Sequence, residues 1–90
     1  MQLTNTVRFY FEEVALSLGH LASLYNYDLL LYEKAEGLYL RSIRIGVALF
    51  GEAYSGLEYD YRGLLRVYLH LQNQDKTMEY MTIIHRQVDI

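Results

Sequence analysis

The sequence predicts an all-α fold in which four main helices form two helix hairpins, stacked as a short right-handed solenoid. Three observations lead to this prediction. The 90 residues include no proline, so nothing interrupts long helices, and 52% of them are apolar, which argues against a disordered chain. Apolar residues recur every three or four positions, as in amphipathic helices. Similar strings also return after about 42 residues, which indicates a repeat.

The first hairpin is expected over residues 13–52. Its first helix, roughly residues 13–27, carries apolar side chains at helical spacing from Val14 onward. A turn is expected at 26–28, because Asn and Asp side chains compete with the helix for backbone hydrogen bonds. The second helix starts near Leu31, and Gly51 is expected to end it in a left-handed conformation.

The second hairpin is expected over residues 53–90. Ser55 is predicted to cap its first helix, with Glu58 as the capping-box partner, and this helix runs to about Leu71. The polar run 72–75 turns the chain into a last helix that covers about 76–88. Residues 1–12 form a separate N-terminal segment in this prediction, either a partial helix or a covering arm.

The repeat is read from two string matches. Residues 21–25 match 64–68 with a shift of 43, and residues 33–36 match 75–78 with a shift of 42, as if one residue were lost between them. Such a period exceeds the roughly 34 residues of a tetratricopeptide unit and falls in the HEAT and armadillo range. Small residues at the expected helix crossings favour lengthened, tetratricopeptide-like hairpins; these are Ala22, Ala35 and Ser42. An ordinary four-helix bundle with accidental similarity between its halves is the alternative.

The composition of the chain excludes several classes of function. The absence of cysteine excludes disulfides and thiolate metal sites, and a net charge of −3 offers no basic face for nucleic acid. The apolar runs are shorter than a transmembrane segment needs, and no signal peptide is visible, so we expect a chain of the cytoplasm or the nucleus.

The sequence shows no catalytic or metal-binding motif. No Glu-x-x-His pair, phosphate loop or nucleophile elbow occurs in the sequence. The paired acids, Glu12 with Glu13 and Glu58 with Asp60, are interpreted as solvated helix faces and caps. We therefore expect no enzyme, no metal and no cofactor.

Binding residues are predicted from the solenoid geometry, in which the first helix of each hairpin lines a concave groove. Asn26 is expected to hold a ligand backbone, and Arg62 and Arg66, one turn apart, to pair with a carboxylate. The groove is therefore expected to prefer an acidic peptide or a C-terminal carboxylate. The alternative is that these are ordinary solvated side chains. The complete set of candidates is Asn26, Tyr27, Tyr59, Arg62, Arg66 and His70.

A family resemblance supports this interpretation. The chain resembles a kinesin-light-chain-type tetratricopeptide array and, more closely, the C-terminal repeats of the amyloid protein-binding proteins. The residues that carry it lie within about 13–71, roughly two thirds of the chain, whereas 1–11, 29–31 and 76–90 depart from the family pattern. The matching stretches are 13–25, 32–36, 38–43, 49–52 and, most specific of all, 54–64.

The resemblance implies a scaffold. Proteins of that family bind the cytoplasmic tail of the amyloid precursor protein, are linked to microtubules and intracellular transport, and serve as substrate receptors of a cullin ubiquitin ligase. The predicted function is a protein–protein interaction module, of adaptor or substrate-receptor type, that binds peptide segments in its groove. The alternative is a structural solenoid end or a homo-oligomer, which the apolar clusters at 9–11 and 29–31 favour.

Overall fold

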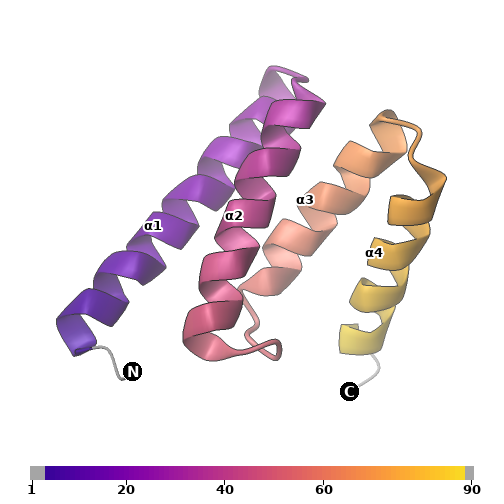
Figure 1. Ribbon diagram of the computed structural model, residues 1–90. Coiled ribbons are helices and arrows are strands. Elements are labelled where there is room, and N and C mark those ends of the chain that lie inside the picture. Colours follow the sequence, from indigo (N-terminus) through magenta and orange to yellow (C-terminus); the bar gives the residue numbers. More distant parts are fainter. Residues whose placement is uncertain (1–3, 89–90) are drawn as a thin grey trace.

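The computed structural model describes residues 4–88 as four long α-helices and one short π-helical turn (Figure 1). No β-strand occurs within these residues, so the all-α prediction is confirmed. None of the helices in this range is long and apolar enough to span a lipid bilayer. The elements are α1 (Asn5–Ser23), η1 (Leu24–Asp28), α2 (Tyr32–Phe50), α3 (Leu57–His70) and α4 (Gln74–Val88).

The helices form an open array in which each one packs on its neighbour in the chain (Figure 1). Helix α1 lies against α2, α2 against α3, and α3 against α4, while α1 also touches α3. Within residues 4–88, α4 packs on α3 alone. A closed four-helix bundle would bring the first and last helices together around one core. The arrangement is therefore that of stacked hairpins, and the bundle alternative is wrong.

Helix α1 begins eight residues earlier than expected. Thr4 caps it, with its Oγ1 accepting a hydrogen bond from the Val7 backbone N–H at 3.2 Å. Residues 5–12 are therefore helical, as one of the two alternatives for the N-terminal segment expected, but they are continuous with the first hairpin and the boundary predicted between 12 and 13 is absent. Residues 1–3 of that segment lie outside the described residues. The aromatic residues Phe9 and Tyr10 hid this extension from the periodicity, because both are largely exposed.

The chain reverses at 29–31, after the predicted turn at 26–28. Residues 26–28 belong to η1, where the Leu29 N–H reaches the Leu24 carbonyl at 3.0 Å. The Asn26 side chain does not compete with the backbone because it is buried and bonded to other helices. Leu30 makes the reversal with a φ of 57°, an uncommon conformation for a residue with a side chain.

The connection between α2 and α3 bears out one capping prediction in part and contradicts the other. Gly51 ends α2 with a positive φ of 82°, as expected for glycine, but its ψ of 176° is not that of the predicted left-handed helical cap. The capping box is wrong, because α3 begins at Leu57 with Gly56 as its cap and no side-chain cap bond. The Glu58 carboxylate instead accepts a bond from Arg62 one turn later, at 2.9 Å.

The repeat has a constant period of 42 residues. Leu30 and Gln72, the two non-glycine residues with positive φ in the described chain, lie 42 apart, as do the first residues of α2 and α4. Two pairs of buried residues also lie 42 apart, Ala15 with Leu57 and Ala22 with Leu64. The prediction that one residue is lost between the repeats is therefore wrong. The shift of 43 aligned residues of similar type that lie on different faces of their helices.

The turn between α3 and α4 is a Schellman motif with glutamine at the glycine position. The Asn73 N–H binds the Tyr68 carbonyl at 3.0 Å, and the Gln72 N–H binds the Leu69 carbonyl at 3.2 Å. Gln72 holds a φ of 57°, which disfavours any residue with a Cβ.

Replacing Gln72 by glycine is therefore expected to raise the free energy of unfolding by about 0.5–1 kcal/mol, since relief of the backbone strain exceeds glycine's extra entropy in the unfolded chain. Urea unfolding followed by circular dichroism measures the change. Gln72→Ala is the matched control, because alanine keeps the Cβ at the same angle and should bring no gain. An equal gain in both variants would contradict the explanation.

The core is rich in buried tyrosine. Tyr39 and Tyr68 are among the largest fully enclosed side chains, and Tyr61 and Tyr80 are also buried. The hydroxyls of Tyr39 and Tyr68 are not left to water. Their hydroxyls bond to protein groups instead, as when Tyr68 donates to Glu36 at 2.6 Å. Burial and the Glu36 carboxylate raise the pKa of Tyr68 well above its ordinary value.

Candidate protein-binding surface

Helix α1, its continuation η1 and helix α3 present a common surface, which we call the α1/α3 face. The Ser23 and Tyr59 hydroxyls lie 2.5 Å apart, and the Arg66 guanidinium lies 4.7 Å from the centre of the Tyr27 ring. About half of each tyrosine is exposed, 51% for Tyr27 and 50% for Tyr59. Arg62 lies on the same stripe of α3, three residues after Tyr59 and four before Arg66. The face comprises Ser23, Tyr27, Tyr59, Arg62 and Arg66.

The two arginines of this face have different partners. Arg62 donates from Nε to Glu58, and its side chain stays 57% exposed. Arg66 is more enclosed: its guanidinium stacks on Tyr27, and its Nε has no hydrogen-bond partner among the described residues. The face therefore carries one solvated, neutralised cation and one cation held against an aromatic ring.

Asn26 does not belong to the surface. It has no exposed area, and its Nδ2 donates to the Tyr39 hydroxyl at 3.2 Å and to the Gly63 carbonyl at 3.1 Å. Tyr39 also bonds to Ser23 at 2.8 Å. The predicted backbone clamp is therefore a buried tie between η1, α2 and α3. It positions the face without reaching a ligand.

His70 is also separate from the other candidates. It lies in the last turn of α3, and its ring stacks on Tyr32 at the start of α2, with centroids 4.6 Å apart and planes 13° apart. This places His70 beside α2 rather than at the contacts of α1 with α3. Four of the six predicted residues, Tyr27, Tyr59, Arg62 and Arg66, are brought together.

A cavity that the sequence did not reveal adjoins Tyr59. It measures about 250 Å³ and has a mostly apolar lining from α1, α2, α3 and the 51–56 loop. Glycines make much of the space: a Cβ on Gly19 would lie 2.9 Å from Asp60 Oδ1, and one on Gly46 would lie 3.1 Å from Leu57. Asp60 lines the cavity, although only 5% of the residue is exposed.

The Asp60 carboxyl is held by a single hydroxyl. Ser42 Oγ lies 2.7 Å from Asp60 Oδ2 and 3.0 Å from the Ala15 carbonyl oxygen. One hydroxyl proton cannot be donated to both acceptors. Both contacts become hydrogen bonds when Asp60 is protonated and donates to Ser42, which then donates to Ala15. Consistently, burial raises the pKa of Asp60 to about 6, against the opposing effects of Ser42 and His20.

The sequence held a signal for this carboxyl. Asp60 lies three residues after Leu57 and four before Leu64, so it falls on the apolar stripe of α3 rather than on its solvated face. Its pairing with Glu58 as a second surface acid hid that position. Within residues 4–88, including the surroundings of Asp60, no cluster of three His, Asp or Glu side chains is placed to hold a metal ion.

Comparison with known proteins adds one relationship. A stretch of 60 residues, 67% of the chain, is 65% identical to a protein of Mus musculus, and its Rattus norvegicus counterpart matches to the same extent. The stretch is similar to amyloid protein-binding protein 2. The match covers 10% of each of those proteins, so the chain spans about a tenth of the length of these curated relatives.

This similarity supports the relationship that the residues of the chain indicated, and its extent agrees with the expected two thirds. No protein-family model matches the chain. The tetratricopeptide character of the hairpins therefore stays a prediction, whereas their all-α, stacked arrangement is observed.

Proposed function

We propose that the chain is a protein-binding module that holds a peptide segment of its partner across the α1/α3 face. The observation that carries this proposal is the gathering of two half-exposed tyrosines and two arginines on one face. Tyrosine and arginine are enriched where proteins bind one another, because they offer large contact areas with polar ends.

The chemistry of the face favours a partner with a carboxylate. Arg66 is positioned by its contact with the Tyr27 ring, so less side-chain freedom is lost when it binds an anion. Arg62 forms an exposed ion pair with Glu58. Breaking this pair to bind a ligand carboxylate costs little free energy, since surface ion pairs contribute little to stability. The proposed ligand is therefore an acidic peptide or a free C-terminus.

The comparison supports a protein partner, because the similar proteins are named for binding an amyloid protein. The finer roles that the family resemblance implies, adaptor, ubiquitin ligase substrate receptor and part of intracellular transport, belong to this proposal. So do a location in the cytoplasm or nucleus and the absence of a catalytic step. The three roles named above would each use the α1/α3 face for binding.

The proposal is tested with Arg62→Glu/Arg66→Glu, a double variant expected to weaken peptide binding at least tenfold, because it removes two cations and adds two anions to the face. Fluorescence anisotropy with an acidic peptide library ending in free carboxylates gives the affinities, and amidated peptides separate the terminal group from acidic side chains.

Arg41→Glu/Arg44→Glu makes the same charge change at exposed positions of α2 and is the matched control. Equal weakening in both double variants would point to net charge and overturn the proposal, as would unchanged affinity in the α3 variant.

A second candidate function is structural: a helical repeat that associates with further copies through apolar surfaces. The observation that favours it is the exposure of large apolar side chains outside the α1/α3 face. Examples are Phe9 and Tyr10 at 62%, Met78 at 63% and Met81 at 50%. Exposed apolar patches of this kind often mark protein contacts.

A further inference from the structure

The contact between α2 and α3 shows how one helix hairpin packs on the next. On the α2 side, Glu36 accepts a hydrogen bond from Tyr68, and Tyr39 packs so closely on Gly63 that a Cβ there would overlap its ring. This α2–α3 contact joins one repeat to the next. Because the period is 42 residues, each half of the contact has an equivalent elsewhere in the chain.

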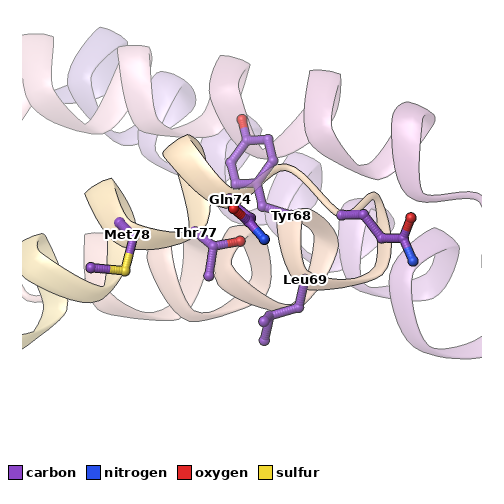
Figure 2. Close-up of a pocket in the computed structure, with 6 residues that line it drawn as sticks. Tyr68, Leu69, Gln74, Thr77 and Met78 are labelled. Carbon is purple, nitrogen blue, oxygen red and sulfur yellow. The ribbon is translucent and has the colours of Figure 1, made fainter.

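The α2 half is repeated on the outer side of α4. Shifting Glu36 and Tyr39 by the period gives Met78 and Met81, and these are the two methionines left 63% and 50% exposed. Figure 2 shows Met78 at the edge of the open cavity that α3 and α4 line near their connecting turn. Helix α4 thus has an exposed apolar surface at the positions that, in α2, contact α3.

The α3 half is repeated on the outer side of α1. Shifting Gly63 back by the period gives Leu21, which is 42% exposed, and shifting Asp60, which contacts Ser42 of α2, gives Leu18. The equivalent of Tyr68 is the buried Asn26, so the hydrogen bond to Glu36 has no counterpart on this surface. Both leucines line a cavity of about 290 Å³ with a predominantly apolar wall, which also includes Val14. Helix α1 thus has an exposed apolar surface at the positions that correspond to Asp60 and Gly63 of α3, which α2 covers.

We propose that these two surfaces bind each other between copies, with α4 of one chain packing on α1 of the next as α2 packs on α3. The occupant of each surface is thus a second copy of this chain, and the continuity of the α2–α3 contact fixes the register. Met81 takes the place of Tyr39 and meets Leu21, so an apolar pair replaces the close tyrosine–glycine contact.

This association is head to tail. Each copy uses α4 toward one neighbour and α1 toward the other, so the contact does not close at two copies and leads to longer open assemblies. The inference rests on the structural candidate function and is independent of the α1/α3 face.

Sedimentation velocity of the full chain over a range of concentrations tests the inference. The expected result is a mass that rises above the 10.6 kDa of one chain without stopping at the dimer. Met81→Glu and Leu21→Glu are each expected to raise the dissociation constant roughly tenfold or more, since a buried charge opposes the apolar contact. Leu16→Glu is the matched control: Leu16 is on the same helix, 44% exposed, and its repeat equivalent is already Glu58.

Mixing the variants distinguishes head-to-tail from symmetric contact. Met81→Glu keeps an intact α1 surface and Leu21→Glu an intact α4 surface, so their equimolar mixture is expected to form a heterodimer that neither variant forms alone. Failure of the mixture to associate while the unmodified chain still does would overturn the register and leave the structural function standing. No association of the unmodified chain, with circular dichroism showing it folded, would overturn both.

Cross-linking gives a readout that does not depend on the charged variants. The chain has no cysteine, so Met81→Cys in one copy and Leu21→Cys in another introduce a single thiol each. Under mild oxidation, the mixture is expected to yield a disulfide heterodimer in preference to either homodimer. Predominant Leu21→Cys homodimers would contradict the head-to-tail contact.

Discussion

Replacing Gly63 by alanine is expected to lower the free energy of unfolding by about 3 kcal/mol, because overpacking a filled core forces both side chains and backbone to move. The added Cβ would overlap the Tyr39 ring, which lies fully buried against α3. Moving that ring also strains the bonds of its hydroxyl to Ser23 and Asn26. Urea unfolding followed by circular dichroism measures the loss.

Gly37→Ala provides the control for this substitution. Gly37 lies inside α2, and nothing comes within 4 Å of an added Cβ there. The same chemical change is therefore expected to stabilise the protein by about 0.5–1 kcal/mol, through the helix propensity of alanine. Similar effects at both positions would show that the close approach of Tyr39 to α3 does not determine the cost.

The second large effect concerns pH. Asp60 has its pKa raised from 3.8 to about 6 in the folded chain, mainly by burial. Between these values the folded chain binds more protons at Asp60 than the unfolded chain does, so the contribution of Asp60 to stability falls as the pH rises. This contribution is fully present below about pH 4 and is lost above about pH 6.

Asp60→Asn isolates this contribution. Asparagine keeps the shape of the side chain without its charge, and its amide donates to Ser42 at every pH. The variant is expected to be about 3 kcal/mol more stable than the parent chain at pH 7.5, with the difference shrinking toward zero near pH 4. Unfolding in urea at a series of pH values gives the two curves.

Asp28→Asn makes the same substitution at an exposed residue, where no buried carboxylate is replaced, and is the control: it should not gain the stability that Asp60→Asn gains at pH 7.5. A constant offset between Asp60→Asn and the parent chain across the series would mean that the carboxyl does not titrate as described.

The helices could be predicted from the sequence because their buried stripes are regular. In α2, Ala35, Tyr39, Ser42 and Gly46 are buried at spacings of three and four, and the helix ends at Gly51 as expected. The turns are harder to predict from the sequence. Asn26 has the composition of a turn residue, and only its distant partners, Tyr39 and Gly63, show why it is buried instead.

The candidate site was predicted in part for the same reason. Tyr27, Tyr59, Arg62 and Arg66 could be placed on one face because helix periodicity determines which positions share a side. Asn26 and His70 could not be placed, since their surroundings depend on how the helices pack on one another. The Asp60 cavity arises from glycines on separate elements, which no single stretch of sequence displays.

The open order of the helices has a consequence for how the chain comes apart. Within the described residues, α4 is held by α3 alone, whereas α2 is held on both sides. Detaching α4 therefore breaks one interface and leaves the Asn26–Tyr39–Gly63 tie untouched. In chains whose units contact only their neighbours, such partial opening precedes global unfolding. Backbone amides of α4 should accordingly exchange with solvent sooner than those of α2, and the molecule melts from its C-terminal helix inward.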